Sequence, residues 1–351
     1  MPLPPIWVRR LVFGPLVVAL AVVLLTTLPI WLILALAFSP FMPGHLRVPR
    51  LIFLAIVYVV WDAAALVALA AMWVASGFGW KIRSPGFQRA HYVLTGGFLR
   101  VLFWIARWSL HLAIDVVGTD PDTALPGRPE IVVSRHAGPG GSFVLIHALV
   151  NWFDREPRIV LKATLQWDPA VDVLLNRLPN RFISPGHTGT RPLEEEVGQL
   201  AHGLDDNDAF VIFPEGGNFT PRRRVRAIAK LRDRGLKDLA VRAENLQNLL
   251  PPKPAGLLAA IDAAPDAGVI FVAHTGLDQM ITMSDVWREL PMDKQLVMRF
   301  WSVPPEEVPT GEEARIAWLY DWWAKIDAWV EEHRPAARPL TTDWTARRTS
   351  V

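Results

Sequence analysis

The chain of 351 residues contains no cysteine. This absence excludes disulfide bonds, thiolate nucleophiles and cysteine-based metal sites. The nine histidines are scattered, so the H-x-x-x-H and H-E-x-x-H spacings of helical metal sites are missing, as are a P-loop and a G-x-G-x-x-G turn after a strand. The formal net charge is only +2, which does not indicate nucleic acid binding. We therefore expect no metal, no resident cofactor and no nucleic acid partner.

Long apolar runs mark the N-terminal part of the chain. Residues 11–38 carry no charged side chain, and residues 51–77 carry only Asp62. Each run is long enough to cross a bilayer core as a helix. We expect a transmembrane hairpin within residues 1–80, with two buried helices of a soluble bundle as the weaker alternative. A cleaved signal peptide fits less well, because a second span follows at once.

Basic residues flank both apolar runs. More of them lie before the first run and after the second than in the loop between, which favours an integral membrane protein with two cytoplasmic termini and with the domain that follows the spans on the cytoplasmic side. Asp62 stands inside a span, and with no obvious partner we favour a structural role for it. The flanking cations are Arg9, Arg10, Arg47, Arg50, Lys81, Arg83 and Arg89.

The rest of the chain divides into four segments. Residues 81–125 are expected to connect the hairpin to the next domain, with helical spacing over 97–116 that suits an interfacial or a packing helix. Residues 126–300 alternate short apolar strands with helices, which predicts an α/β domain with a largely parallel sheet. Residues 301–335 contain an amphipathic helix that we expect to pack on this domain, with docking on the membrane surface as the alternative. Residues 336–351 are expected to be disordered.

The expected secondary structure of the α/β domain follows from its apolar runs and turn residues. Strands are predicted over 131–133, 158–162, 182–183, 209–213 and 269–273, and helices over 141–152, 168–178, 191–204, 225–234, 236–248, 256–264 and 312–332.

A histidine stands on the turn between the first predicted strand and the first helix. The turn reads Arg135-His136-Ala137-Gly138-Pro139-Gly140-Gly141-Ser142. Open α/β sheets bind ligands at this end of a strand, and histidine is suited to proton transfer near neutral pH. No G-x-S-x-G elbow surrounds Ser134 or Ser142, so a serine hydrolase is not favoured. The alternative is a loop histidine held by a structural hydrogen bond.

A second turn of this kind, Phe213-Pro214-Glu215-Gly216-Gly217, follows the strand predicted over 209–213. Glycines there let backbone N–H groups approach an anion; a surface turn is the alternative. A basic run from Arg222 to Lys237 comes next. It is either a solvated helix face or a surface for phosphates or anionic headgroups.

Together the two turns resemble the first and third sequence blocks of the glycerolipid acyltransferases, the family of lysophosphatidate acyltransferases. The resemblance implies that His136 is the general base, and that the segment Phe213, Pro214, Glu215 and Gly216 binds the acceptor phosphate. The segment from Leu178 to Ile183 resembles the second block, and implies a phosphate contact for Arg181; a surface salt bridge is the alternative. The family's further arginine is replaced by residues 184–186. Residues 269–273 match the fourth block loosely, because its proline is absent and His274 follows.

One position departs from the first block. The family has an aspartate, which orients the imidazole of the base, where this chain has Gly141. Loss of such a carboxylate costs up to roughly 10⁴-fold in a serine protease triad. Three explanations stay open. Another carboxylate could substitute, with Asp168, Asp172 and Glu215 as candidates. The chain could be a slow or inactive relative, or this copy could carry a single substitution.

The resemblance implies a membrane-anchored acyltransferase of phospholipid biosynthesis. It would move a fatty acyl group from acyl-CoA, or from an acyl carrier protein, to the hydroxyl of a lysophospholipid, with lysophosphatidate favoured. Acyl-CoA is then a co-substrate, and the bilayer is a partner. One alternative is a non-catalytic lipid- or acyl-CoA-binding relative. Another is an acyltransferase for a different lipid or a glycolipid acceptor.

Overall fold

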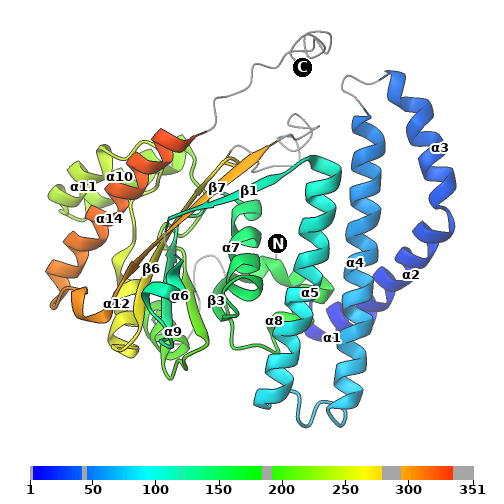
Figure 1. The fold of residues 1–351 in the computed structure, drawn as a ribbon, viewed down its shortest axis with the longest axis horizontal. Coiled ribbons are helices and arrows are strands. Elements are labelled where there is room, and N and C mark those ends of the chain that lie inside the picture. The colour runs from blue at the N-terminus through cyan, green and yellow to red at the C-terminus, as the bar shows by residue number, and fades with distance from the viewer. Residues whose placement is uncertain (1–2, 42–45, 119, 184–191, 279–293, 335–351) are drawn as a thin grey trace.

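The computed structural model describes residues 3–41, 46–118, 120–183, 192–278 and 294–334. The expected C-terminal tail and residues 184–186 lie outside these ranges. The chain forms a group of long helices beside an α/β domain, and helix α5 lies between the two (Figure 1).

The first apolar run is two helices rather than one. Helix α1 (Ile6–Val8), a π-helical turn (Arg9–Phe13) and α2 (Gly14–Thr26) are continuous, and α3 (Leu28–Phe38) follows a break at Thr27. A proline in the first turn of α3 cannot donate to the preceding turn, which explains the break. Both α2 and α3 pack along α4 (Arg47–Ala75). By length and composition, three stretches could cross a membrane: Ile6–Thr26, Val48–Ala75 and Pro85–Leu110.

The third of these stretches is α5 (Pro85–Leu110). The helix expected over residues 97–116 is therefore wrong beyond Leu110. His111 adopts a left-handed conformation that ends α5, and Ala113–Val117 forms strand β1. Because β-branched residues dominate this segment, it suits an extended chain.

The α/β domain is built on one sheet with strand order β1-β7-β6-β2-β5-β3-β4. Neighbouring strands from β6 to β4 are parallel, which confirms the largely parallel sheet predicted from the sequence. Strand β7 runs antiparallel to β6, and β1 is parallel to β7. The sheet thus extends past both expected domain limits, 126 and 300. The other strands are β2 (Glu130–Ser134), β3 (Glu156–Lys162), β4 (Arg181–Ile183), β5 (Asp208–Ile212), β6 (Gly268–Thr275) and β7 (Gln295–Val303).

Helices cover both faces of the sheet. Helix α7 (Pro139–Asn151) and α5 pack on one face, around Val132 and Ile270. Helices α9 (Leu193–Ala201), α12 (Pro254–Ala263) and α14 (Glu312–His333) pack on the other. The fully buried Trp323 shows that the expected C-terminal helix packs into the core. The remaining elements are α6 (Pro121–Ala124), η3 (Ala163–Trp167), α8 (Pro169–Leu175), α10 (Pro221–Asp233), α11 (Lys237–Glu244) and η4 (Pro305–Glu307).

Ionic contacts hold the N-terminal helices to the α/β domain at α8. The carboxylate of Asp172, whose side chain is fully buried, lies 3.0 Å from Nη2 of Arg9 and 3.2 Å from Nε of Arg10. On the same helix, Asp168 caps the N-terminus by accepting from the Val171 amide, and the Tyr58 hydroxyl of α4 donates to it. These contacts make α8 the docking point of the N-terminal helices.

Candidate active site

The carboxyl ends of four neighbouring strands meet at one edge of the sheet. His136 follows β2, and Phe213 follows β5. Lys162 is the last residue of β3, and His274 is the second-last residue of β6. Parallel strands bring their carboxyl ends together, and α/β proteins bind ligands there. The structure thus joins the two turns that the sequence singled out, and adds Lys162 and His274 to them.

The imidazole of His136 is half-buried and packs against the ring of Phe213. The two ring centroids are 4.9 Å apart, with an interplanar angle of 37°. Its Nδ1 atom is buried and has no hydrogen-bond partner. This arrangement leaves Nε2 as the ring nitrogen available to a substrate hydroxyl.

The imidazole of His136 is neutral at pH 7 and faces positive charge. Burial, and after it the charges of Lys162 and Arg223, lower the pKa of His136 to about 4. The pKa of Lys162 is itself lowered by burial and by Arg223. A neutral imidazole is the form that can accept a proton. Lys162 was not among the site residues expected from the sequence. Its position as the last residue of the strand predicted over 158–162 is the sequence feature that could have identified it.

The turn after β5 brings further cations close to glycine backbone. The amide of Gly216 donates to the Phe213 carbonyl over 3.1 Å, and its φ of +67° favours glycine. A Cβ atom at Gly216 would lie 2.7 Å from Nζ of Lys253, and one at Gly217 would lie 2.9 Å from Nη1 of Arg223. The two glycines therefore let a lysine and an arginine lie directly against the backbone. The Pro214 carbonyl accepts from the Lys253 amide over 2.9 Å.

Glu215 points into the protein. It is 4% exposed, and its oxygens accept from the backbone amides of His136 (2.7 Å) and Leu250 (2.9 Å). Burial raises the pKa of this carboxyl to about 7, against the attraction of Arg135 and these two amides. Both oxygens are engaged, so Glu215 fixes the loop that carries the base. The direct contact with an acceptor expected for it stays a prediction.

Arg181 is not brought to the base. It begins β4, three strands from β2, a separation of roughly 14 Å at the usual strand spacing. Its Nη2 and Nε atoms bind the carboxylate of Glu196 at 2.5 and 3.1 Å, and this interaction raises its pKa. The phosphate contact that the resemblance implies for Arg181 stays a prediction.

No expected carboxylate reaches the His136 imidazole in the described part of the chain. Asp168 and Asp172 are engaged on α8, and Glu215 binds only backbone amides. The position of the family's aspartate, Gly141, lies in the first turn of α7 and faces the ring of His274.

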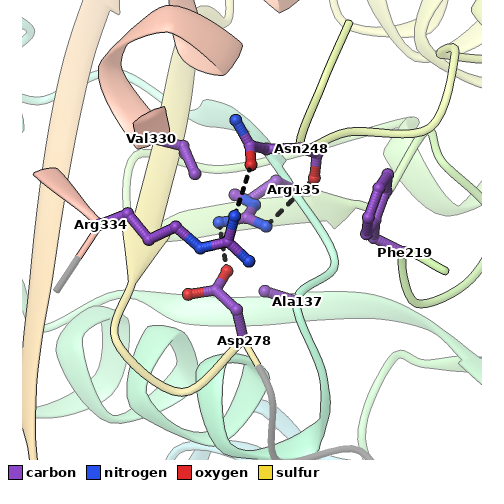
Figure 2. A pocket seen from close by; sticks show the side chains of 7 residues that line it. All are labelled: Arg135, Ala137, Phe219, Asn248, Asp278, Val330 and Arg334. Atoms are coloured by element: carbon purple, nitrogen blue, oxygen red, sulfur yellow. Dashed lines mark hydrogen bonds and ion pairs between the residues drawn. The ribbon is translucent and has the colours of Figure 1, made fainter. Parts of the chain in front are cut away.

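A small cavity of about 40 Å³, with both polar and apolar lining, lies behind the loop that carries His136. Figure 2 shows the guanidinium of Arg135 between Asp278 and Asn248. It lies 2.6 Å from the Asp278 carboxylate and donates to the Asn248 and His274 carbonyls. Arg135 and Ala137 line this cavity. Because side chains of an extended chain point alternately to its two sides, the side chain of His136 points away from the cavity. Space of this size suits water, so the cavity supports the loop and is not the substrate site.

Residues 115–289 match the sequence model of the acyltransferase family. The chain belongs to the acyltransferase family. The enzyme class expected from the two turns is thereby confirmed. A solved structure similar to this acyltransferase is the 1-acyl-sn-glycerophosphate (LPA) acyltransferase PlsC from Thermotoga maritima, which is 16% identical, with a TM-score of 0.44. The match covers 78% of this chain and 98% of that chain. No curated protein matches the sequence of the acyltransferase.

Proposed function

We propose that this acyltransferase moves a fatty acyl group from a thioester donor, acyl-CoA or an acyl carrier protein, to the hydroxyl of a lysophospholipid. Lysophosphatidate is the first candidate acceptor. The observation that carries the proposal is a neutral imidazole, His136, whose pKa is depressed by burial and by two facing cations, Lys162 and Arg223. Such a site combines a proton acceptor with a field that attracts an anionic substrate.

The reaction needs one base that accepts and then returns a proton. Nε2 of His136 takes the proton of the acceptor hydroxyl as its oxygen attacks the thioester carbonyl carbon. The tetrahedral intermediate then collapses, the carbon–sulfur bond breaks, and the departing thiolate takes the proton from the imidazolium. The products are the ester and a free thiol, and His136 returns to its neutral form.

A phosphate on the acceptor would complete the electrostatics of the site. Lys253 and Arg223 lie against the glycines of the turn after β5, and Lys162 lies near His136 and Arg223; a phosphate suits several such donors at once. Its negative charge would also oppose the effect of these cations on His136 and raise the pKa of the base. Binding of a phosphate-bearing acceptor therefore strengthens the base that attacks with it.

The apolar helices suit an enzyme whose substrates are lipids. Three described helices are long and apolar enough to cross a bilayer. We propose that the apolar helices before α5 anchor the enzyme as an integral membrane protein in phospholipid biosynthesis, with the catalytic domain on the cytoplasmic side, while α5 packs on the sheet. Docking at α8 would then hold the site close to the membrane surface.

An acceptor panel tests the proposal. Reconstituted enzyme receives labelled acyl-CoA with lysophosphatidate or with monoacylglycerol, which lacks the phosphate. We expect lysophosphatidate to be acylated, His136→Ala to abolish turnover, and Lys162→Met to raise KM for lysophosphatidate roughly 10- to 100-fold, as loss of one charged hydrogen bond predicts. Arg222→Met, one residue from Arg223 and exposed, is the matched control and should change little.

Two results would contradict this function. Equal turnover of monoacylglycerol and lysophosphatidate would show that the enzyme does not recognise the acceptor phosphate. Tight binding of labelled acyl-CoA without transfer to any lysophospholipid would favour the alternative of a non-catalytic binding protein.

A further inference from the structure

The two histidines at the carboxyl ends of β2 and β6 lie on the same face of the sheet. These strands are parallel neighbours, with Ser134 opposite Val272. Two more residues in this register place His136 opposite His274, at the usual strand spacing of about 4.8 Å. Even-numbered residues of both strands, such as Val132 and Ile270, face α5 and α7. Both imidazoles therefore lie beneath the first turn of α7.

Gly141 of that turn leaves the space that His274 fills. A Cβ atom at Gly141 would lie 2.7 Å from Nδ1 and 2.8 Å from Nε2 of His274, and closer still to Cε1. Such distances do not occur in packed proteins, and His274 is only 2% exposed, so its ring has no free space to move into. The glycine at 141 and the histidine at 274 thus fit each other, and the imidazole occupies the place where the motif aspartate would project.

Each of the two rings has one buried nitrogen without a partner, Nδ1 in His136 and Nε2 in His274. A buried polar atom that lacks a hydrogen bond is destabilising. His274 hydrogen-bonds the backbone of Arg135, and because Nε2 is unpartnered this bond uses Nδ1. Nε2 of a neutral His274 therefore carries a lone pair and can accept a hydrogen bond.

The electrostatic surroundings keep His274 neutral. Burial and the charge of Arg135 lower its pKa to about 4, against the opposite effects of the Asp278 carboxylate and of the hydrogen bond to the Arg135 backbone. A protonated His136 would lower the pKa of His274 further. At neutral pH His274 is therefore not an imidazolium, and its Nε2 is an acceptor nitrogen beside His136.

We propose that His274 is the positioning residue of this acyltransferase and takes the place of the motif aspartate: its Nε2 accepts the Nδ1–H of His136 through one bridging water. The tautomer with Nε2 unprotonated is then selected in His136, and that nitrogen faces the acceptor hydroxyl. The inference rests on the proposed function for its kinetic consequences. It gives Gly141 a role, because only glycine leaves room for the second ring.

Two substitutions of similar volume separate positioning from packing. In His274→Gln an amide oxygen can still accept the hydrogen bond, whereas His274→Leu fills the space without an acceptor. We expect His274→Leu to lower kcat roughly 10- to 1000-fold with little change in KM, and His274→Gln to retain most of kcat. Equal losses of kcat in the two variants, or no loss in either, would overturn the proposal.

Exchange of the two positions gives a second test. Gly141→Asp alone should lower kcat, because the new side chain displaces the His274 ring. Gly141→Asp combined with His274→Ala gives the carboxylate room and should recover activity above either single variant. The carboxylate should also move the acid limb of kcat/KM to higher pH, since a nearby negative charge raises the pKa of His136. If kcat of the double variant were no higher than the value expected from multiplying the losses of the two single variants, the exchange would be contradicted.

A spectroscopic readout keeps this inference distinct from the proposed function. If the wild-type enzyme acylated no acceptor, the proposed function would fail, and ¹⁵N chemical shifts of histidine-labelled protein would still report the tautomer of His136. We expect Nδ1–H in the wild type and in His274→Gln, and a mixture of tautomers in His274→Leu. The same tautomer in all three proteins would overturn the role of His274.

Discussion

Lys162→Met should move the acid limb of the pH–rate profile to higher pH. Neutral His136 is the reactive form, so kcat/KM falls as pH falls through its pKa, which is about 4 in the free protein against an ordinary 6.5. Burial is the largest of the three causes and Lys162 the second. Because Lys162 ranks below burial, it accounts for at most half of the lowering, which is about one pH unit or on the order of 1 kcal/mol. Methionine keeps an unbranched side chain of similar length at this exposed position and removes the charge.

The measurement is kcat/KM for acyl transfer to lysophosphatidate in vesicles, from about pH 3.5 to about pH 8. This parameter reports the free enzyme, in which no substrate phosphate offsets the cation. Ionisation of the acceptor phosphate is common to all variants and cancels in the comparison, with Arg222→Met as the charge-matched control. An unchanged acid limb in Lys162→Met, or a shift to lower pH, would refute the idea that Lys162 faces the base.

Three further predictions concern stability. The pKa of His274 is lower in the folded than in the unfolded chain, so the unfolded state binds more protons. This group alone should therefore lower the free energy of unfolding by about 2 kcal/mol between pH 7 and pH 5. The decrease should be smaller in His274→Gln, and the same pH dependence in this variant would contradict the prediction. Asp172→Asn leaves the buried Arg9 without its counter-charge and should lower the free energy of unfolding by about 3–5 kcal/mol, seen as a lower Tm in detergent; a wild-type Tm would show that the pair does not hold the N-terminal helices. Glu215→Gln leaves one of two backbone amides facing an NH2 group, and should cost about 1–3 kcal/mol and reduce kcat by loosening the loop of His136; full kcat with a lower Tm would limit Glu215 to stability.

The sequence predicted the parts of the fold that depend on local pattern. Fully buried strands such as β2 and β5 appear as short apolar runs, and the turns that follow them carry His136 and Phe213. Strands β1 and β7 were missed for a physical reason. The antiparallel β7 alternates buried and partly exposed residues, among them Arg299 and Trp301, and β1 follows directly on a long helix, so neither has the uniform apolar run of an inner parallel strand.

The candidate site was predicted only where residues follow each other in the chain. Gly141 and His274 are two separate residues, 133 positions apart in the sequence. They become one feature when β2 and β6 pair in parallel and bring His274 beneath Gly141. That pairing depends on the register of strands far apart in the chain. For the same reason the carboxylates expected to replace the aspartate could not be placed, and they serve the α8 docking point and the His136 loop instead.

The docking of the N-terminal helices at α8 limits how the enzyme can be made water-soluble. A chain shortened to begin after α4 would lose Arg9 and Arg10, the counter-ions of the fully buried Asp172, together with the Tyr58 donor to Asp168. Two carboxylates on one seven-residue helix would then lack these partners. Shortening would have to be combined with an uncharged, well-packed residue at position 172, because replacement of a buried ion pair by apolar groups is often neutral or stabilising.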